Sequence, residues 1–125
     1  MAELKVLIVD DEQINIELLM ETMEVIGCEN TSATTSPVEA IKRYENESFD
    51  LVLLDLNMPE MSGYDVLDRL LKIEKPAKAK IVILTGHNDE SIKKRVLDQG
   101  AAGMLSKPFG MNEIVDCIKH SMTSI

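Results

Sequence analysis

The sequence predicts an α/β domain in which a doubly wound sheet of parallel strands carries helices on both faces. Five short segments suited to strands alternate with five segments whose apolar residues recur at helical spacing. This alternation is typical of a parallel sheet, because neighbouring parallel strands are usually joined through a crossover helix. A chain of 125 residues suits one compact unit, so we expect a single domain over residues 1–125.

Composition and charge restrict the classes of function. Thirteen basic against 22 acidic residues give a net charge of -9, which repels phosphate backbones and anionic membranes. Aromatic residues make up only 3% of the chain, so no platform for stacking bases is indicated. No apolar stretch approaches the roughly 20 residues of a membrane span, and the N-terminus lacks the features of a signal peptide. Because Cys28 and Cys117 form no Cys-x-x-Cys pair, we expect a reduced, cytoplasmic protein without direct nucleic-acid binding or membrane insertion.

Local signals place the first two strand–helix units. Leu4–Val9 is expected to form the first strand, and a helix runs from Glu12 to a stop at Gly27. That helix is expected to be amphipathic, with one stripe formed by Ile14, Leu18, Thr22 and Val25. The second strand, Glu29–Thr34, is polar, which suits the edge of a sheet. Ser36-Pro37-Val38-Glu39 is a capping box with Pro at the first position of a helix that should bury Ala40, Ile41 and Tyr44.

The third strand stands at the centre of the pattern. Leu51–Leu54 is an unbroken apolar run, which suits a strand buried on both faces, and Asp55 ends it abruptly. A loop punctuated by Pro59 and Gly63 leads to the third helix, which should end before Pro76. The apolar residues of this helix are Val66, Leu67, Leu70, Leu71 and Ile73.

The last two units are shorter. Ile81–Leu84 is expected to be the fourth strand, and Asn88 or Asp89 should cap a fourth helix that stops at Gly100. Gly103–Leu105 is a short fifth strand. Helical spacing in the final segment is carried by Met111, Ile114, Val115, Ile118 and Met122.

This arrangement gathers polar residues from four segments at one edge of the sheet. A polar edge strand favours the flavodoxin-like strand order 2-1-3-4-5, with five helices. In such sheets ligands bind beyond the carboxyl ends of the strands, at the switch point between strands one and three. The residues expected there are Asp10, Asp11, Asp55, Thr85 and Lys107. Each alone is compatible with capping or solvation, but capping does not explain three carboxylates crowded at one spot.

A divalent cation would remove the repulsion between these carboxylates. Oxygen ligands suit Mg²⁺, which proteins bind through one or two carboxylates together with substrate phosphate. Asp55 would then be a nucleophile that attacks phosphorus. Thr85 would donate a hydrogen bond to one transferred oxygen, and Lys107 would place its charge beside another. The pattern predicts a covalent phosphoryl-accepting site.

Four short motifs stand in an order and spacing that together are highly specific: Asp10-Asp11, Asp55-Leu56-Asn57-Met58-Pro59 through Gly63, Thr85-Gly86 and Lys107-Pro108. In these motifs the chain resembles the receiver domain of two-component response regulators. The resemblance implies phosphorylation of Asp55 by a phosphohistidine of a sensor histidine kinase or a histidine phosphotransfer protein. It also implies Mg²⁺ held by Asp11, Asp55 and the backbone carbonyl of Asn57, with Asp10 acting partly through water.

Further expectations follow from the same resemblance. It implies a cis peptide before Pro108, which aims Lys107 inward. It implies a phosphoacceptor with weak self-phosphotransfer and self-dephosphorylation activity rather than an enzyme, with Asn57 and His87 flanking the path of the hydrolytic water. The signal should leave through the fourth helix, the fifth strand and the last helix toward a downstream effector that the sequence does not name. Relatives often carry Tyr or Phe three residues before the lysine, where this chain has Met104.

Three other classes of protein share parts of this pattern. A flavodoxin-type electron carrier needs a hydroxyl- and glycine-rich phosphate loop after the first strand, where this chain has two carboxylates. A haloacid-dehalogenase-type phosphatase needs a second Asp two residues after its nucleophile, and Asn57 occupies that place. A phosphorylation-independent scaffold of the receiver fold has no need for all five polar residues, and it stays the alternative hypothesis.

Overall fold

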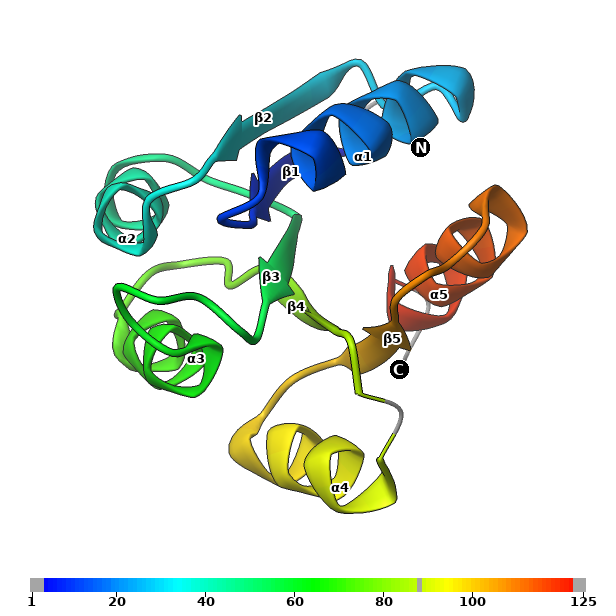
Figure 1. Ribbon diagram of the computed structural model, residues 1–125. Helices are drawn as coiled ribbons and strands as arrows, with labels where there is room; N and C mark the ends of the chain where they lie inside the picture. The colour runs from blue at the N-terminus through cyan, green and yellow to red at the C-terminus, as the bar shows by residue number, and fades with distance from the viewer. Residues whose placement is uncertain (1–3, 88, 123–125) are drawn as a thin grey trace.

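The computed structural model describes residues 4–87 and 89–122, which form one sheet of five parallel strands (Figure 1). The strand order is β2-β1-β3-β4-β5. The strands are β1 (Lys5–Val9), β2 (Asn30–Thr34), β3 (Leu51–Asp55), β4 (Lys80–Thr85) and β5 (Gly103–Ser106). They alternate with helices α1 (Gln13–Val25), α2 (Pro37–Asn46), α3 (Gly63–Lys72), α4 (Glu90–Gln99) and α5 (Met111–Met122). The fold class and strand order expected from the sequence are therefore confirmed.

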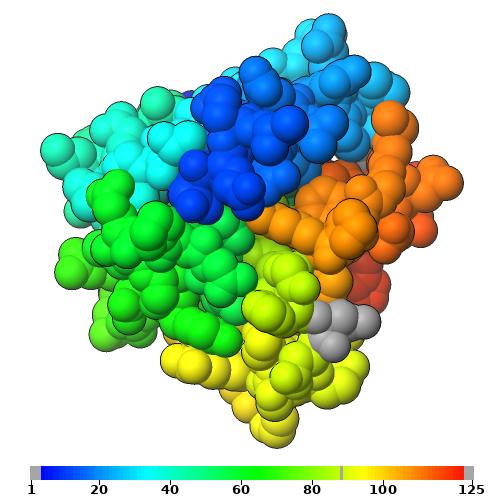
Figure 2. All heavy atoms as spheres, viewed as in Figure 1, coloured from blue at the N-terminus to red at the C-terminus, as the bar shows by residue number. Residues whose placement is uncertain are grey.

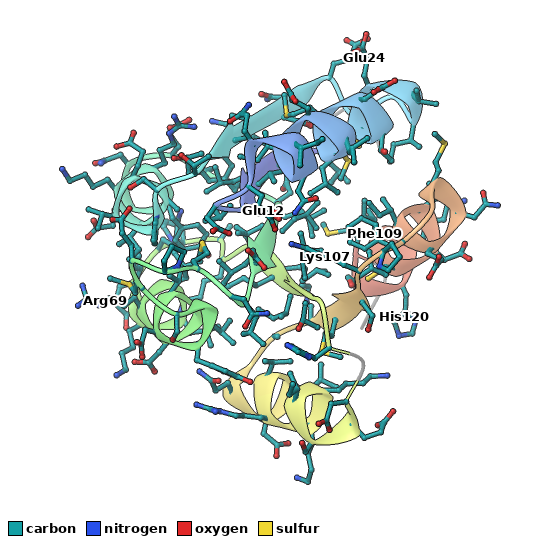
Figure 3. The ribbon with its side chains drawn as sticks, viewed as in Figure 1. Glu12, Glu24, Arg69, Lys107, Phe109 and His120 are labelled. Atoms are coloured by element: carbon teal, nitrogen blue, oxygen red, sulfur yellow. The ribbon has the colours of Figure 1, made fainter. Side chains whose placement is uncertain are left out.

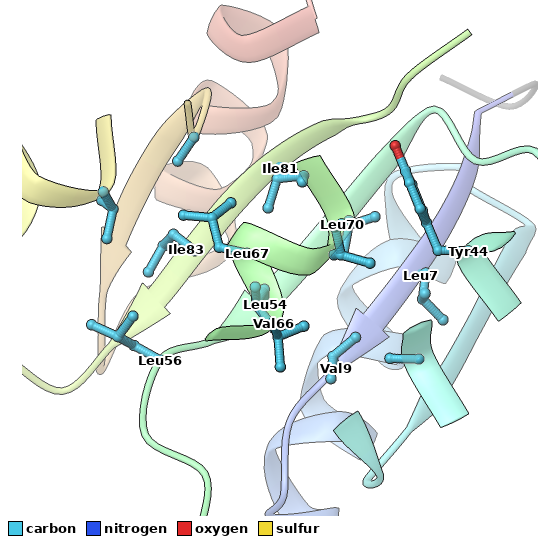
Figure 4. Close-up of a cluster of buried hydrophobic side chains, with 14 of the residues drawn as sticks. Leu7, Val9, Tyr44, Leu54, Leu56, Val66, Leu67, Leu70, Ile81 and Ile83 are labelled. Carbon is cyan, nitrogen blue, oxygen red and sulfur yellow. The ribbon is translucent and has the colours of Figure 1, made fainter. Parts of the chain in front are cut away.

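Helices cover both faces of the sheet. Helices α1 and α5 lie on one face, and α2, α3 and α4 lie on the other (Figure 1). Because successive side chains of a strand point to opposite faces, each face buries its own apolar cluster. In β1, for example, Ile8 packs toward α1 and α5, whereas Leu7 packs toward α2 and α3. Figure 4 shows the apolar cluster on the face covered by α2, α3 and α4, where Leu67 and Leu70 of α3 pack on the strands.

The position of each strand in the sheet explains its composition. The interior strands β1, β3 and β4 are buried on both faces, which accounts for their continuous runs of Val, Ile and Leu. Strand β2 lies at an edge and is only partly buried, as its polar sequence predicted. Arg43 of α2 covers part of that edge, because its Nη1 donates a hydrogen bond to the Ala33 carbonyl at 3.2 Å.

Most helix ends follow their local signals. The Ser36 hydroxyl accepts a hydrogen bond from the N–H three residues on at 3.2 Å, and Pro37 is the first helical residue of α2. Asp89 caps α4, since its carboxylate accepts the N–H of the residue two positions on at 2.8 Å. The other candidate for that cap, Asn88, lies outside the described residues. The glycines expected to end helices have positive φ: Gly27 (90°) and Gly100 (125°).

Helix α1 packs on the sheet with a different apolar side from the one that the sequence predicted. Its predicted stripe does not face the sheet, because Ile14, Leu18 and Val25 are 64%, 58% and 64% exposed. The buried face consists of Ile16, Leu19 and Met23. Helix α1 is apolar on two sides, and only one of them can pack on the sheet. The buried side is apolar throughout, whereas the exposed stripe includes Thr22.

Two boundaries matter for the site. Strands β3 and β4 extend one residue beyond their apolar runs, so Asp55 and Thr85 are the last residues of their strands. Helix α3 ends at Lys72, and Ile73, expected on the helix, has an extended backbone but still packs against the core. Within the described residues, no helix has the length and apolar character that crossing a membrane requires.

Candidate functional site

Three carboxylates meet at the carboxyl edge of the sheet. Asp10 directly follows β1, Asp11 is the next residue of the loop into α1, and Asp55 ends β3. One ligand oxygen from each carboxylate lies within 4.8 Å of the other two. Asp10 and Asp55 are 0% and 2% exposed, so two of the three carboxylates are removed from water. Figure 2 shows four segments that are distant in sequence, coloured blue, green, yellow-green and orange, converging on one face of the molecule.

Lys107 bridges the two buried carboxylates. Its Nζ lies 2.9 Å from Asp10 Oδ2 and 3.3 Å from Asp55 Oδ1. Burial acts to lower the pKa of Lys107, but the hydrogen bonds and charges of the two aspartates outweigh burial and raise that pKa above its ordinary value. The ammonium is therefore charged at neutral pH. The peptide bond between Lys107 and Pro108 is cis, as the resemblance implied.

The carboxyl of Asp55 is strongly perturbed. Burial, followed by the negative charge of Asp10, raises the pKa of Asp55 to about 7. Lys107 and the Asn57 N–H, which lies 3.3 Å from Asp55 Oδ1, act in the opposite direction without compensating. One ammonium is shared by two buried carboxylates, so the site keeps an excess of negative charge. Such a carboxyl is typical of functional sites and favours the entry of a further cation.

Asp10 and Asp11 differ in their protein contacts. Asp10 Oδ1 accepts the Glu12 N–H at 3.0 Å, and its other oxygen binds Lys107. Asp10 therefore orders the loop that leads into α1, whose N-cap residue, Glu12, receives no cap from a side chain. Both oxygens of Asp10 have protein partners, and Asp11 is the more accessible of the two carboxylates.

Thr85 reaches the same edge from the neighbouring strand. It is fully buried, and its Oγ1 accepts the His87 N–H at 3.1 Å. Its carbonyl accepts the Lys107 N–H at 2.7 Å. Asp55 pairs with Leu84 across the sheet, so Thr85 lies one position further along the edge. Among the described residues, no hydrogen bond joins the Thr85 hydroxyl to the buried carboxylates.

Gly63 holds the loop after β3 against the end of that strand. Its N–H donates a hydrogen bond to the Leu56 carbonyl at 2.8 Å. A Cβ atom at Gly63 would lie 2.4 Å from Leu56 Cα and 2.6 Å from the Asp55 carbonyl oxygen, distances that no side chain tolerates. The absence of a side chain therefore lets the loop turn back over the site, where Asn57 meets the Asp55 carboxylate.

A pocket of about 480 Å³ adjoins the site between α1 and the loop that follows Lys107. Leu18 lines one wall and Phe109 lines another. Figure 3 shows Glu12 on the α1 side of this region and Lys107 and Phe109 on the other. The sequence interpretation missed this surface. The available signal was the second apolar side of α1, which the core had no means of burying.

Met104, the position at which relatives often have an aromatic residue, lies half-buried in β5. Its side chain packs on the α2–α3–α4 face, and so does Ile92 of α4. The next residue, Leu105, packs on the opposite face, as alternation along a strand requires. Met104 is therefore placed between the sheet and the side of the molecule that carries α4.

Fold and site together define a class: a doubly wound α/β domain with a buried aspartate, an acidic pair and a lysine at the switch point of its sheet, consistent with a phosphoacceptor. A family model described as the response regulator receiver domain matches residues 6–119. The chain belongs to this family, the receiver domains of two-component response regulators. Members of the family are phosphoacceptors rather than enzymes in the usual sense.

Similar proteins include regulators of different lengths. The chain is 36% identical over 110 residues to the transcriptional regulatory protein KdpE of Mycobacterium tuberculosis, covering 88% of this chain and 47% of KdpE. It is 29% identical over 114 residues to the chemotaxis protein CheY of Thermotoga maritima, covering 91% and 93%. A chain in the crystal structure of the CheX–CheY–BeF3–Mg+2 complex of Borrelia burgdorferi superposes with a TM-score of 0.87 at 25% identity, covering 97% and 90%. The chain spans less than two thirds of several curated relatives.

Proposed function

We propose that this domain is a phosphorylation-controlled switch. Asp55 accepts a phosphoryl group from the phosphohistidine of a sensor histidine kinase or a histidine phosphotransfer protein, in a reaction that depends on Mg²⁺. The observation that carries the proposal is the buried Asp55 carboxyl, with a pKa of about 7, sharing Lys107 with Asp10. A scaffold that is independent of phosphorylation would lose nothing by replacing these charges with apolar groups, and such replacement is often stabilising.

The donor set fits Mg²⁺. Three carboxylates within 4.8 Å offer only oxygen, and their excess negative charge favours a small divalent cation. Since both oxygens of Asp10 have protein partners, we assign direct coordination to Asp11, Asp55 and the carbonyl of Asn57, with Asp10 acting through water. The cation would neutralise charge on the transferred phosphoryl group. The Borrelia complex contains BeF3 and Mg+2, which supports Mg²⁺ as the cation.

In the proposed transfer, a carboxylate oxygen of Asp55 attacks phosphorus while the bond from phosphorus to the donor's imidazole nitrogen breaks. The electron pair of that bond stays on the imidazole, whose other ring nitrogen carries a proton, so the ring leaves as neutral histidine. The Thr85 hydroxyl then donates a hydrogen bond to one phosphoryl oxygen, and the Lys107 ammonium moves from Asp10 toward another. Lys107 needs only a small shift, because its Nζ already lies 3.3 Å from Asp55.

Hydrolysis of the acyl phosphate is proposed to be a slow side activity. Asn57, two residues after Asp55, can orient a water molecule but cannot take its proton. We therefore expect the phosphorylated chain to persist and to show no turnover of phosphomonoesters at ordinary enzyme rates, roughly 1 per second or faster. Timing the loss of radiolabelled phosphate from the native chain and from His87→Ala measures the lifetime and the contribution of His87. Rapid multiple turnover by the native chain would contradict the proposal.

The donor is proposed to dock on the exposed stripe of α1 and the adjoining pocket. Ile14 and Leu18 are exposed apolar residues of α1, and Leu18 lines the same pocket as Lys107, which would take an apolar side chain of the partner. Residues 6–41 include no Lys or Arg, and their acidic residues are Asp10, Asp11, Glu12, Glu17, Glu21, Glu24, Glu29 and Glu39. Charge complementarity therefore favours a donor surface with an apolar centre and a basic rim.

The central test combines metal and phosphodonor. With Mg²⁺ present, acetyl phosphate should add one phosphoryl group to Asp55, detected by mass spectrometry of the intact chain and its peptides, and a chelator should abolish the modification. Asp55→Asn should not be labelled. Asp11→Ala should weaken Mg²⁺ binding more than Asp10→Ala, because Asp11 is the proposed direct ligand. Stable phosphate on Asp55→Asn, or full labelling without metal, would overturn the assignment.

The output surface of the switch is proposed to consist of α4, β5 and α5, next to the loop that follows Thr85. Drawing the Thr85 hydroxyl toward a phosphoryl group moves that loop and biases the neighbouring surface, as in other phosphoryl switches. A cytoplasmic location and the absence of direct nucleic-acid binding stay predictions.

A further inference from the structure

Helix α4 is fastened to α3 by two side chains that converge on one residue. The Arg95 guanidinium stacks over the Tyr64 ring, with Cζ 3.6 Å from the ring centroid. Gln99 Nε2 donates a hydrogen bond to the Tyr64 carbonyl at 3.3 Å. Residues four apart lie on one side of a helix, so both contacts hold the same side of α4 against the start of α3. We call Tyr64, Arg95 and Gln99 the latch.

The latch is connected through the backbone to the proposed phosphoacceptor. Tyr64 follows Gly63, whose N–H binds the Leu56 carbonyl at 2.8 Å. Gly63 also lies so close to the Asp55 carbonyl that a Cβ would not fit. The start of α3 therefore cannot shift relative to the end of β3 without breaking these contacts. A change around Asp55 has a short path to α4 through Tyr64, separate from the path through Thr85.

The two contacts of the latch are suited to release. Arg95 is exposed, so its stacking on the ring can be broken without leaving a charge buried. Gln99 makes one hydrogen bond, but its Oε1 is buried and has no hydrogen-bond partner among the described residues. A buried polar atom without a partner opposes the arrangement that buries it. The latch thus combines favourable contacts with a penalty that its release would relieve.

We propose that the latch holds α4 in its resting arrangement and that phosphorylation of Asp55 releases it. This inference rests on the proposed function of Asp55. Coupling between two sites is reciprocal, so a change that releases α4 must also favour occupancy of Asp55. Loss of the Arg95 contact should tighten the binding of beryllium fluoride roughly two- to fivefold, the range that an exposed cation–π contact provides.

Matched variants separate the latch from general effects of charge and packing. Arg95→Ala and Tyr64→Leu each remove the stacked pair. Lys94→Ala removes the same charge from the neighbouring position, but Lys94 pairs with Asp98 on its own helix at 2.7 Å and not with α3. Tyr64→Phe keeps the ring and the backbone carbonyl, so it should preserve the latch.

The experiment titrates beryllium fluoride into the native chain and each variant in the presence of Mg²⁺, followed by amide chemical shifts. Arg95→Ala and Tyr64→Leu should bind more tightly, and their α4 amides should already lie partway toward the bound positions before ligand is added. Lys94→Ala and Tyr64→Phe should match the native chain. Equal affinity in all chains, or weaker binding by Arg95→Ala, would overturn the latch and leave the Asp55 assignment standing. Failure of the native chain to bind would overturn the proposed function, and the latch with it.

Discussion

Among single residues, Asp55 has the most unusual environment. Its carboxyl is 2% exposed, and burial together with the charge of Asp10 raises its pKa to about 7. In the unfolded chain the same carboxyl returns to its ordinary value of 3.8. Between these two values the folded state holds a proton that the unfolded state lacks. The free energy of unfolding therefore falls as pH rises through this window.

Removing this carboxyl should make the metal-free chain more stable at neutral and mildly basic pH. We expect the native chain to lose roughly 2 kcal/mol of unfolding free energy between about pH 5 and pH 8 through Asp55 alone. Asp55→Asn should flatten the profile and exceed the native stability at the upper end. Urea denaturation at several pH values, in the presence of a chelator, measures the unfolding free energies of the native chain and of Asp55→Asn. Glu17→Gln is the control at an exposed carboxylate. A native profile that parallels that of Asp55→Asn would show that Asp55 does not titrate in this range.

At the scale of elements, the turn between β3 and α3 depends on one missing side chain. Gly63→Ala would place Cβ 2.4 Å from Leu56 Cα, so the loop must move. We expect this substitution to destabilise the chain by about 2–4 kcal/mol and to weaken Mg²⁺ binding, because the loop carries Asn57. Gly86→Ala is the matched control, since a Cβ there meets nothing within 4 Å. Urea denaturation and Mg²⁺ titration should separate the two variants, and equal behaviour would show that the loop adapts.

Helix α1 allows a direct comparison of its two apolar sides. Leu19 is buried against the sheet, and Leu19→Ala should cost about 3 kcal/mol of unfolding free energy. Leu18 is 58% exposed, so Leu18→Ser should change stability by less than about 0.5 kcal/mol. Transfer from a phosphohistidine protein to Leu18→Ser should nevertheless slow, whereas labelling by acetyl phosphate should not. Unchanged transfer would exclude Leu18 from the donor surface.

Some features of the fold and site can be predicted from sequence patterns, and others cannot. The cap at Ser36 depends on residues adjacent in the chain, so local spacing predicts it. The meeting of Asp10, Asp55 and Thr85 follows from topology, because parallel strands bring their carboxyl ends to one edge. The orientation of α1 depends on which of two apolar sides fits the sheet, a choice that packing makes. The steric role of Gly63 and the contacts of the latch depend on distances between segments, which periodicity does not encode.

Across the whole molecule, charge is unevenly distributed. The first third carries the uninterrupted acidic set of residues 6–41, whereas α4 carries Lys93, Lys94 and Arg95 in succession. The surface on which we expect the donor to dock and the surface from which we expect the signal to leave thus differ in charge. Long-range fields steer approaching proteins before contact. This distribution favours partners of opposite charge on the two surfaces.

Coupling across the molecule is expected to depend on Thr85 more than on Met104. Binding of beryllium fluoride should change the amide shifts of α4, β5 and α5, and Thr85→Ala should strongly reduce these changes. Met104 has several accessible rotamers and can fill space without a large swing, so Met104→Ala should only diminish them. Shifts of both variants with and without ligand provide the measurement. If Thr85→Ala shows the same ligand-induced shift changes in α4, β5 and α5 as the native chain, Thr85 does not couple Asp55 to that surface.

Lys107 provides the metal-free site with a counter-ion that belongs to the chain itself. In the metal-free chain its tethered ammonium is the counter-ion of both Asp10 and Asp55. In the proposed reaction an arriving cation would take over part of the charge of Asp55, while this ammonium stays within reach of the transferred phosphoryl group. The resting site therefore never exposes its full negative charge. The concentration of free cation would then decide whether Asp55 carries the ammonium alone or the ammonium together with a cation when the phosphodonor arrives.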